Sequence, residues 1–427
     1  MPFRFVHTAD IHLDSPLRSL ALRDPALAEL VGDASRRAFT GIIDLCLAEA
    51  VDALLIAGDL YDGEQTSMKT ALFLAGQLRR LHEAGIPTFI IRGNHDALSR
   101  VTRELTLPDT VKLFGGRAEA VALERAPGEL PVIIHGLSFA RSHAPDGLLP
   151  QYRAPQAGAI NIGMMHTSLD GAPGHDPYAP CAAADLLASG FDYWALGHIH
   201  RRAVIEGACT VVMPGMPQGR DIGEAGPKSV SLVRIEDDRT VHVAQHPTGI
   251  AQFERAAVDL SGIDDWRDLL HAAAAALRAL RASVAAEHLI VRLALAGATP
   301  LAWRLRRDAD QVQAELNAIA AELPGCWIDS VETALVSLPA LAEQPGADGS
   351  AVAELQRLIG SDILPAASYQ RALAEIADEL RGQLPPECRH LLGTDAEQAR
   401  RALAALARDG VQDVLARLQA VPDREAP

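Results

Sequence analysis

Lysine is nearly absent from this sequence. Only Lys69, Lys112 and Lys228 occur in 427 residues, so almost all of the positive charge is arginine. The formal net charge is -16 at pH 7. This balance excludes a surface that grips nucleic acid everywhere, because phosphate binding is mainly electrostatic. Any contact with nucleic acid must therefore be local.

Cysteine and long apolar runs are also scarce. The five cysteines are widely spaced without a Cys-x-x-Cys pair, which argues against a zinc ribbon or a redox motif, and we expect reduced thiols. No apolar run approaches the length of a membrane span, and the first residues have no apolar signal core. We therefore expect a cytoplasmic protein with no membrane partner. A G-x-x-x-x-G-K-[ST] loop is absent as well, so ATP binding would have to come from another chain.

Apolar segments of strand length alternate with helical stretches over residues 1–250, which predicts an α/β domain. The early strands are almost wholly apolar, as expected of strands covered on both faces. Crossover helices are predicted at 29–51 and 68–84. The predicted strands are 3–8, 53–57, 88–91, 132–135, 160–165, 193–196, 211–213, 230–235 and 241–244.

The pattern after residue 250 predicts a smaller α/β domain over residues 251–338. Strands are expected at 254–260, 289–294 and 327–336, and helices at 264–281 and 300–323, the second with Thr299 as N-cap and Pro300 at its first position.

A Pro/Gly/Ala-rich stretch, 338–350, reads as a linker to a helical C-terminal region, 351–427. Tyr369, Leu373, Ile376 and Leu380 share one helical stripe, and Thr394 with Glu397 predicts a capping box. We favour packing of these helices within the chain over docking to another protein.

Five short motifs in the first domain carry side chains that bind metals. Each begins where a predicted strand stops, and the carboxyl ends of strands are the usual place for ligands in α/β folds. Oxygen and imidazole donors of this kind suit Mn, Fe or Zn. The motifs are Asp10-Ile-His12, Gly58-Asp59, Gly93-Asn94-His95-Asp96, Met165-His166 and Gly197-His198-Ile199-His200.

Strand geometry gives the motifs a first interpretation. Residues i and i+2 share a face, so Asp10 and His12 are expected to reach one ion. His198 and His200, roughly 6.5–7 Å apart along an extended strand, are expected to serve one ion each. Asp59 is suited to bridge two ions at roughly 3.5–4 Å, the spacing of two-metal hydrolysis.

The remaining polar residues of these segments are predicted to assist. His95 follows Asn94 and points elsewhere if Asn94 binds metal, so it is the candidate general acid. Asp62 and Asp96 are expected to orient a histidine or a water. Arg220 is expected to clamp a phosphate oxygen, with a surface ion pair as the equally weighted alternative. Nine other histidines are expected to be structural: His7, His82, His135, His143, His242, His246, His271, His288 and His390.

The motifs together resemble the calcineurin-like metallophosphoesterases. Within the SbcD/YhaO-type DNA repair exonucleases, the segments His7–Pro16, Met213–Arg220 and His166–Pro180 are similar to the YhaO-type proteins, whereas classical SbcD-like sequences lack the Gly174–Pro180 loop and the Pro217–Arg220 segment. The resemblance implies a β-sandwich flanked by helices (αββα), with the second domain as a capping domain that contacts DNA. It implies one metal at Asp10, His12, Asp59 and His200, and the other at Asp59, Asn94, His166 and His198, with His95 assisting.

The resemblance also implies a function. It predicts a two-metal DNA nuclease, an exonuclease in DNA repair, using Mn²⁺ in preference to Fe²⁺ or Zn²⁺. Its partners would be DNA and an SMC-like coiled-coil ATPase of the SbcC or YhaN kind, and a homodimer is expected from related nucleases. Two alternatives stay open: a phosphodiesterase for small molecules such as cyclic nucleotides, and a DNA-end and ATPase-binding subunit with weak hydrolysis.

Overall fold

The computed structural model describes residues 1–15, 17, 24–62, 67–96, 107–139, 147–171, 178–337, 351–383 and 395–418. The chain divides into two compact units, one of residues 1–254 with 284–290, the other of residues 255–283 with 291–427. The predicted linker at 338–350, the Thr394 cap, Pro16 and the Gly174-His175 segment lie outside the described residues. The expected domain boundaries therefore stay predictions.

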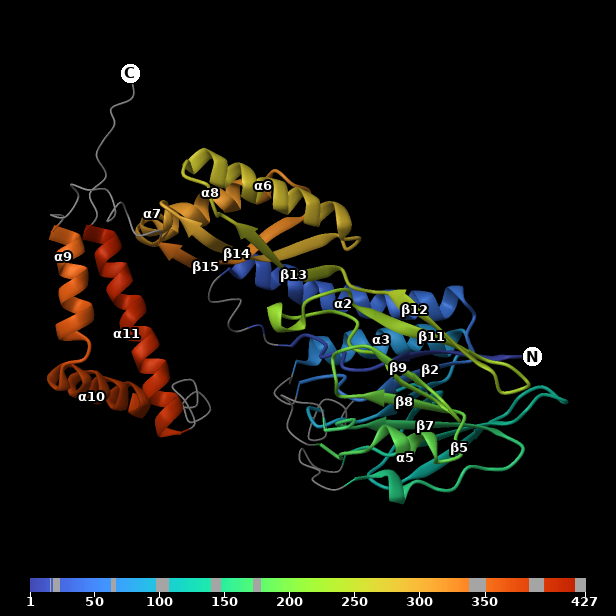
Figure 1. Cartoon of the computed structure of the whole chain (residues 1–427). Coiled ribbons are helices and arrows are strands. Elements are labelled where there is room, and N and C mark those ends of the chain that lie inside the picture. The colour runs from blue at the N-terminus through green and yellow to red at the C-terminus, as the bar shows by residue number, and fades with distance from the viewer. Residues whose placement is uncertain are drawn as a thin grey trace. The chain divides into compact units, whose positions relative to one another are not determined.

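Two six-stranded sheets form the first unit (Figure 1). The first has the order β12-β11-β1-β2-β3-β4, in which β1, β2, β3 and β4 run parallel and β11 and β12 are antiparallel. Its strands are β1 (Phe3–Thr8), β2 (Ala53–Ala57), β3 (Thr88–Ile91), β4 (Val111–Leu113), β11 (Ser229–Ile235) and β12 (Val241–Pro247).

The second sheet has the order β5-β6-β7-β8-β10-β9, with β6, β7, β8 and β10 parallel and the two edge strands antiparallel. Its strands are β5 (Glu119–Leu123), β6 (Val132–Gly136), β7 (Ile160–His166), β8 (Tyr193–Gly197), β9 (Ala203–Glu206) and β10 (Thr210–Met213). The parallel strands β6, β7, β8 and β10 are wholly buried.

Alternating side chains of each central strand point to opposite faces of its sheet and pack in different hydrophobic cores, and these cores show the order of the layers. Phe5 and Leu55 pack with Ile134 and Ile162 of the other sheet, so the two sheets share a core. Neighbouring side chains of the first sheet, among them Leu54, pack instead under α2 (Pro25–Ala48) and α3 (Met68–Glu83). On the outer face of the second sheet, Leu186 of α5 (Ala183–Leu187) packs with Trp194 and Val211. The first unit is thus a β-sandwich with helices on both faces, as predicted.

A three-stranded sheet of order β13-β14-β15 follows, formed by β13 (Ala251–Asp259), β14 (His288–Thr299) and β15 (Cys326–Ser337). Its helices are α6 (Trp266–Ser283), α7 (Ala302–Arg307) and α8 (Ala309–Ala321). The prediction of one helix over 300–323 was wrong. The helix breaks at Asp308, whose φ of -107° and ψ of 35° leave the helical region, and Asp308 pairs with Arg307. Thr299 still accepts a hydrogen bond from the Leu301 amide, 3.0 Å away, but it ends a strand.

The helical C-terminal region contains α9 (Ala351–Leu358), a π-helical turn (Ile359–Ile363), α10 (Ala367–Gln383) and α11 (Ala396–Leu418) (Figure 1). The predicted stripe on α10 lines a groove of about 440 Å³ together with residues of α11. Several large apolar side chains that line the groove are more than half exposed, including Ile376 of α10 at 57% and Leu406 of α11 at 57%. Packing within the chain therefore covers only part of this stripe.

Three strands were not predicted: β4, β5 and β9. Each is short, and none has a fully buried side chain, so none carries the continuous apolar run that marks the central strands. No helix among the described residues is long and apolar enough to cross a membrane. The four described cysteines, Cys46, Cys181, Cys209 and Cys326, are buried free thiols.

Candidate metal centre

The metal motifs lie at or just after the carboxyl ends of β1, β2, β3, β7 and β8, and His166 is the last residue of β7. The first two motifs are joined through their backbones. The amides of Asp10, His12 and Leu13 donate hydrogen bonds to the carbonyl oxygens of Gly58, Asp59 and Leu60 over 3.1, 3.0 and 2.9 Å.

The expected strand geometry of the ligands was wrong. β1 ends at Thr8 and β8 at Gly197, before their ligands begin. Asp10, His12 and Asp59 have φ angles of 52°, 45° and 50°, and His198 has 103°. Residues other than glycine rarely adopt such angles, and clusters of them mark functional sites. Left-handed turns, and not the period of a strand, aim these side chains.

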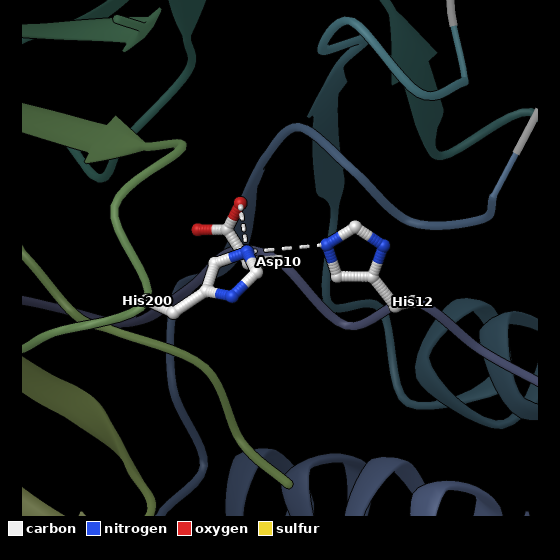
Figure 2. Close-up of side chains that lie close together, drawn as sticks. All are labelled: Asp10, His12 and His200. Carbon is white, nitrogen blue, oxygen red and sulfur yellow. Dashed lines mark hydrogen bonds and ion pairs between the residues drawn. The ribbon is translucent and has the colours of Figure 1, made fainter. Parts of the chain in front are cut away.

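Asp10, His12 and His200 form the first cluster, with ligand atoms within 4.8 Å of one another. In Figure 2 the Nε2 atoms of the two rings face each other, with the Asp10 carboxylate beside them. The two Nε2 atoms are 3.3 Å apart, and Asp10 Oδ1 lies 3.9 Å from His200 Nε2. His12 Nδ1 lies 2.7 Å from Asp62 Oδ1 and His200 Nδ1 lies 2.8 Å from Glu224 Oε1. Because a carboxylate accepts, both Nδ1 atoms donate, and the Nε2 atom of each ring is the one that faces inward and can bind a cation when it carries no proton. Facing lone pairs beside a carboxylate fit a cation.

Asp59, His166 and His198 form the second cluster, again within 4.8 Å. His166 Nδ1 donates to the Ala57 carbonyl oxygen over 2.9 Å, so its Nε2 is the inward atom. That atom lies 3.3 Å from Asp59 Oδ2 and 3.1 Å from Asn94 Oδ1, and Asn94 Oδ1 lies 3.2 Å from His198 Nδ1. Burial lowers the pKa of His166, but the Asp59 carboxylate outweighs burial and raises that pKa to about 9, so His166 Nε2 donates to Asp59 in the metal-free protein. A cation that displaces this proton would meet oxygen and imidazole ligands on several sides.

Asp59 lies between the two clusters. Its Oδ2 is 3.3 Å from His166 Nε2 and 3.9 Å from His12 Nε2. Gly93 allows this approach, because a Cβ there would stand 2.3 Å from Asp59 Oδ1 and 2.6 Å from His166 Nε2. Burial raises the pKa of the Asp59 carboxyl, but the His166 ring outweighs burial and holds that pKa well below its usual range. Asp59 therefore stays an anion within reach of both clusters.

His95 lies at the edge of the centre. Its backbone amide donates to Asp59 Oδ1 over 3.0 Å, while its ring is 48% exposed with Nδ1 3.3 Å from Asp62 Oδ1. Burial lowers the pKa of His95, and the carboxylates of Asp59 and Asp62 oppose that shift. The ring is thus held by a carboxylate on one side and reaches solvent on the other.

Asp96 plays a different part from Asp62. It is 2% exposed, and its two oxygens accept from the Gly93 and Leu60 amides over 2.7 and 3.0 Å. Burial, with the nearby Asp59 charge, raises the pKa of Asp96 to about 8. Asp96 thus links two metal-binding loops through their backbones, and its predicted role in orienting a histidine or a water stays a prediction.

Arg220 lies beside the first cluster, where it forms an ion pair with Glu224; its predicted contact with a phosphate oxygen stays a prediction. Its side chain donates to Glu224 over 2.6 Å from Nη2, and Nη1 lies 3.8 Å from Asp62 Oδ1. Glu224 was missed in the sequence, where the only sign of it is its position four residues after Arg220. The neighbouring Gln218 is buried and bonded to the backbone of Ile250 and Ala251, so it holds the loop in place.

Two family models match the chain. Residues 3–202 match "Calcineurin-like phosphoesterase" and residues 253–336 match "Metallophosphoesterase YhaO, middle domain". The protein described as "Uncharacterized metallophosphoesterase YhaO" of Bacillus subtilis is 34% identical over 320 residues, covering 74% of this chain and 76% of that protein. The chain belongs to the calcineurin-like metallophosphoesterases. These are hydrolases of phosphoester bonds with a dinuclear metal site.

Archaeal DNA double-strand break repair proteins Mre11 are more distant relatives of this metallophosphoesterase. That of Sulfurisphaera tokodaii is 26% identical over 220 residues, or 50% of this chain and 54% of that protein. That of Methanopyrus kandleri is 23% identical over 256 residues, or 56% and 52%. The chain thus spans about half the length of the Mre11 proteins that it matches.

Solved structures give a weak likeness. TT1561 of Thermus thermophilus aligns at 15% identity over 57% of this chain and 99% of its own, with a TM-score of 0.33. A dimetal phosphatase from Danio rerio aligns at 13% identity over 58% of this chain and 100% of its own, with a TM-score of 0.32. At these scores the likeness says nothing about substrate.

Proposed function

We propose that this metallophosphoesterase is a nuclease that hydrolyses phosphodiester bonds of DNA from an end, in DNA repair. The observation that carries the proposal is the pair of acceptor clusters that share Asp59. Oxygen and imidazole acceptors facing one another suit two divalent ions, for which we propose Mn²⁺ before Fe²⁺ or Zn²⁺. When bound, such ions polarise the phosphoryl group and supply an activated water.

His95 is the residue that we propose to protonate the departing sugar oxygen. Asp62 faces its Nδ1 at 3.3 Å and stabilises the charged ring, which leaves Nε2 to carry the transferred proton. The half-exposed ring can meet a substrate that arrives from solvent. The hydrogen bond from the His95 backbone amide to Asp59 fixes the position of His95 relative to the carboxylate that the two clusters share.

DNA is favoured over a small phosphodiester because of the relatives. The Mre11 proteins are named for repair of DNA double-strand breaks, and the match to the YhaO middle domain shows that the chain keeps a family module beyond the hydrolytic one. With a net charge of -16, contact with DNA has to be confined to the neighbourhood of the cations. We extend the proposal to a cytoplasmic location.

The test compares two substrates with the full chain. Residues 284–290 belong to the first unit, so deleting everything beyond residue 250 would cut that unit and is unsuitable. We expect Mn²⁺-dependent cleavage of end-labelled linear DNA and of bis-p-nitrophenyl phosphate, with a closed circle resistant. His95→Ala and Asp59→Ala should each lower DNA cleavage by about 100-fold or more.

His246→Ala is the matched control, because His246 is an exposed residue of β12 with no part in the site. Cleavage of the small diester without cleavage of DNA would favour the small-molecule phosphodiesterase. Cleavage of neither, with DNA ends still bound, would favour the binding subunit with weak hydrolysis.

A coiled-coil ATPase of the SMC kind is the partner that we propose. The groove between α10 and α11 supports this, because half-exposed apolar side chains spaced three or four residues apart fit the apolar stripe of another helix. A homodimer stays a prediction.

A further inference from the structure

The two clusters of the metal centre differ in what holds their histidines. In the second cluster, a neutral backbone carbonyl, that of Ala57, accepts from His166 Nδ1. In the first cluster, carboxylates accept from both rings: Asp62 from His12 and Glu224 from His200. A carboxylate behind a metal-binding imidazole fixes its tautomer and makes its inward nitrogen more basic. Carboxylates therefore support both histidines of the first cluster, whereas a neutral carbonyl supports His166 of the second.

Glu224 is placed by its own local structure. It ends the 3-10 turn Ile222–Glu224, which Asp221 caps by accepting from the Gly223 amide over 2.7 Å. Its side chain is 11% exposed, and its Oε2 accepts from the Arg220 amide over 2.7 Å. Its other oxygen, Oε1, accepts hydrogen bonds from His200 Nδ1 and from Arg220 Nη2. The carboxylate is thus held from three directions and has little freedom to leave His200.

Arg220 connects the two supporting carboxylates. It donates to Glu224 from the main chain and the side chain, and its Nη1 lies 3.8 Å from Asp62 Oδ1. Two anions on one side of a site repel each other, and a guanidinium between them offsets that repulsion. The hydrogen bonds that Glu224 accepts from His200 and Arg220, and the guanidinium beside Asp62, support both carboxylates as anions.

We infer that Glu224, with Arg220 linking it to Asp62, is a positioning residue that strengthens binding of one of the two metal ions, the ion at Asp10, His12 and His200. Glu224 contacts His200, a ligand of the first ion, so a change at Glu224 affects this ion and leaves the ion at Asp59, His166 and His198 unchanged. The inference rests on the metal-dependent hydrolysis proposed above, but its test measures metal binding.

The test titrates Mn²⁺ into the metal-free full-length protein by calorimetry and electron paramagnetic resonance. The wild type should bind two ions, which give the spectrum of a coupled pair. Glu224→Gln should keep one ion at unchanged affinity and bind the other about 10-fold to 100-fold more weakly. Its spectrum at two equivalents should be that of an isolated ion. Glu206→Gln loses the same charge at an exposed position of β9 and should match the wild type.

Double variants identify the affected site. Adding Glu224→Gln to His200→Asn should change little, because both act on the same ion. Adding it to His198→Asn should weaken the ion that remains, because the two changes act on different ions. Equal weakening of both ions, no weakening of either, or the reverse pattern in the double variants would overturn the inference.

A second variant keeps the test decisive if Glu224→Gln unfolds, which the melting temperature of the metal-free protein reports. Asp62→Asn removes the support of His12, a ligand of the same ion, and should produce the same loss at one site. Loss at the other site, or at none, would contradict the inference. If metal binding behaves as expected but the wild type cleaves no DNA, the proposed nuclease function fails and the inference about Glu224 stands.

Discussion

His7 offers a quantitative test of how burial sets protonation in this fold. Its ring is fully buried, with Nε2 3.0 Å from the Leu196 carbonyl oxygen and Nδ1 2.9 Å from the Tyr193 hydroxyl. The carbonyl needs a donor, so Nε2 carries the hydrogen, and the neutral Nδ1 accepts from the hydroxyl. Burial lowers the pKa of His7 to about 3. The folded protein therefore holds a neutral ring.

The sign of the effect follows from the two states. The unfolded chain takes up a proton on His7 as pH falls below the ordinary value of 6.5, whereas the folded protein does so only near 3. The stability contribution is therefore fully present above 6.5 and is lost as pH falls toward 3. Between about pH 7.5 and about pH 5.5, this one group should cost about 1.4 kcal/mol of unfolding free energy.

The assay compares the wild type with His7→Asn, which cannot titrate. Urea unfolding is followed at both pH values, with a chelator present, through the fluorescence of Trp194 in a background whose other three tryptophans are replaced by phenylalanine. The stability advantage of the wild type over the variant should shrink by about 1.4 kcal/mol at the lower pH. Tyr193→Phe keeps the buried ring and should retain the wild-type pH dependence. An advantage that stays constant within about 0.5 kcal/mol would refute the reasoning.

Two further predictions concern space and surface. Gly93→Ala places a Cβ 2.3 Å from Asp59 Oδ1 and should lower hydrolysis of bis-p-nitrophenyl phosphate by about 10-fold or more. The control Gly76→Ala adds a Cβ in open space on α3 and should stabilise the protein by about 0.5–1 kcal/mol. Equal activity in both variants would contradict the prediction. Ile376→Asp, in the groove between α10 and α11, should weaken binding of the ATPase in a pull-down by about 30-fold without changing hydrolysis. The control Ala374→Asp, on α10 outside the groove, should bind the ATPase normally. Equal binding by the two variants would argue against docking of the ATPase in the groove.

The sequence predicts the central strands well because burial leaves a plain signal in them. Every residue of β2, Ala53–Ala57, is buried, and a continuous apolar run is what a strand covered on both faces requires. The edge strand β9 has no fully buried residue, and its Val204 is 40% exposed, so its segment resembles a loop. The helix break at Asp308 escaped prediction since its neighbours keep helical periodicity on both sides.

For the candidate site, prediction from the sequence is limited in a different way. Motif chemistry selects the side chains, and the structure brings all eleven predicted residues to one region, although their roles stay predictions. Their supports are harder to see: Glu224 lies 24 residues after His200, and only the fold joins the two. The backbone partners of Asp96 are hidden for the same reason, because they are amides of two separate loops; its role as an orienting group stays a prediction.

Backbone strain explains why the periodicity of strands or helices in the sequence could not predict the geometry of the site. Asp10, His12, Asp59 and His198 all have positive φ, and each such residue costs about 1–3 kcal/mol. Four of them cost roughly 4–12 kcal/mol, comparable to the whole stability of a typical domain at about 5–15 kcal/mol. Such a set persists only because the buried strands before it and the hydrogen bonds between the 10–13 and 58–60 loops fix the backbone. The ligands are therefore held in place before a metal arrives, so the energy of metal binding is not spent on folding the loops.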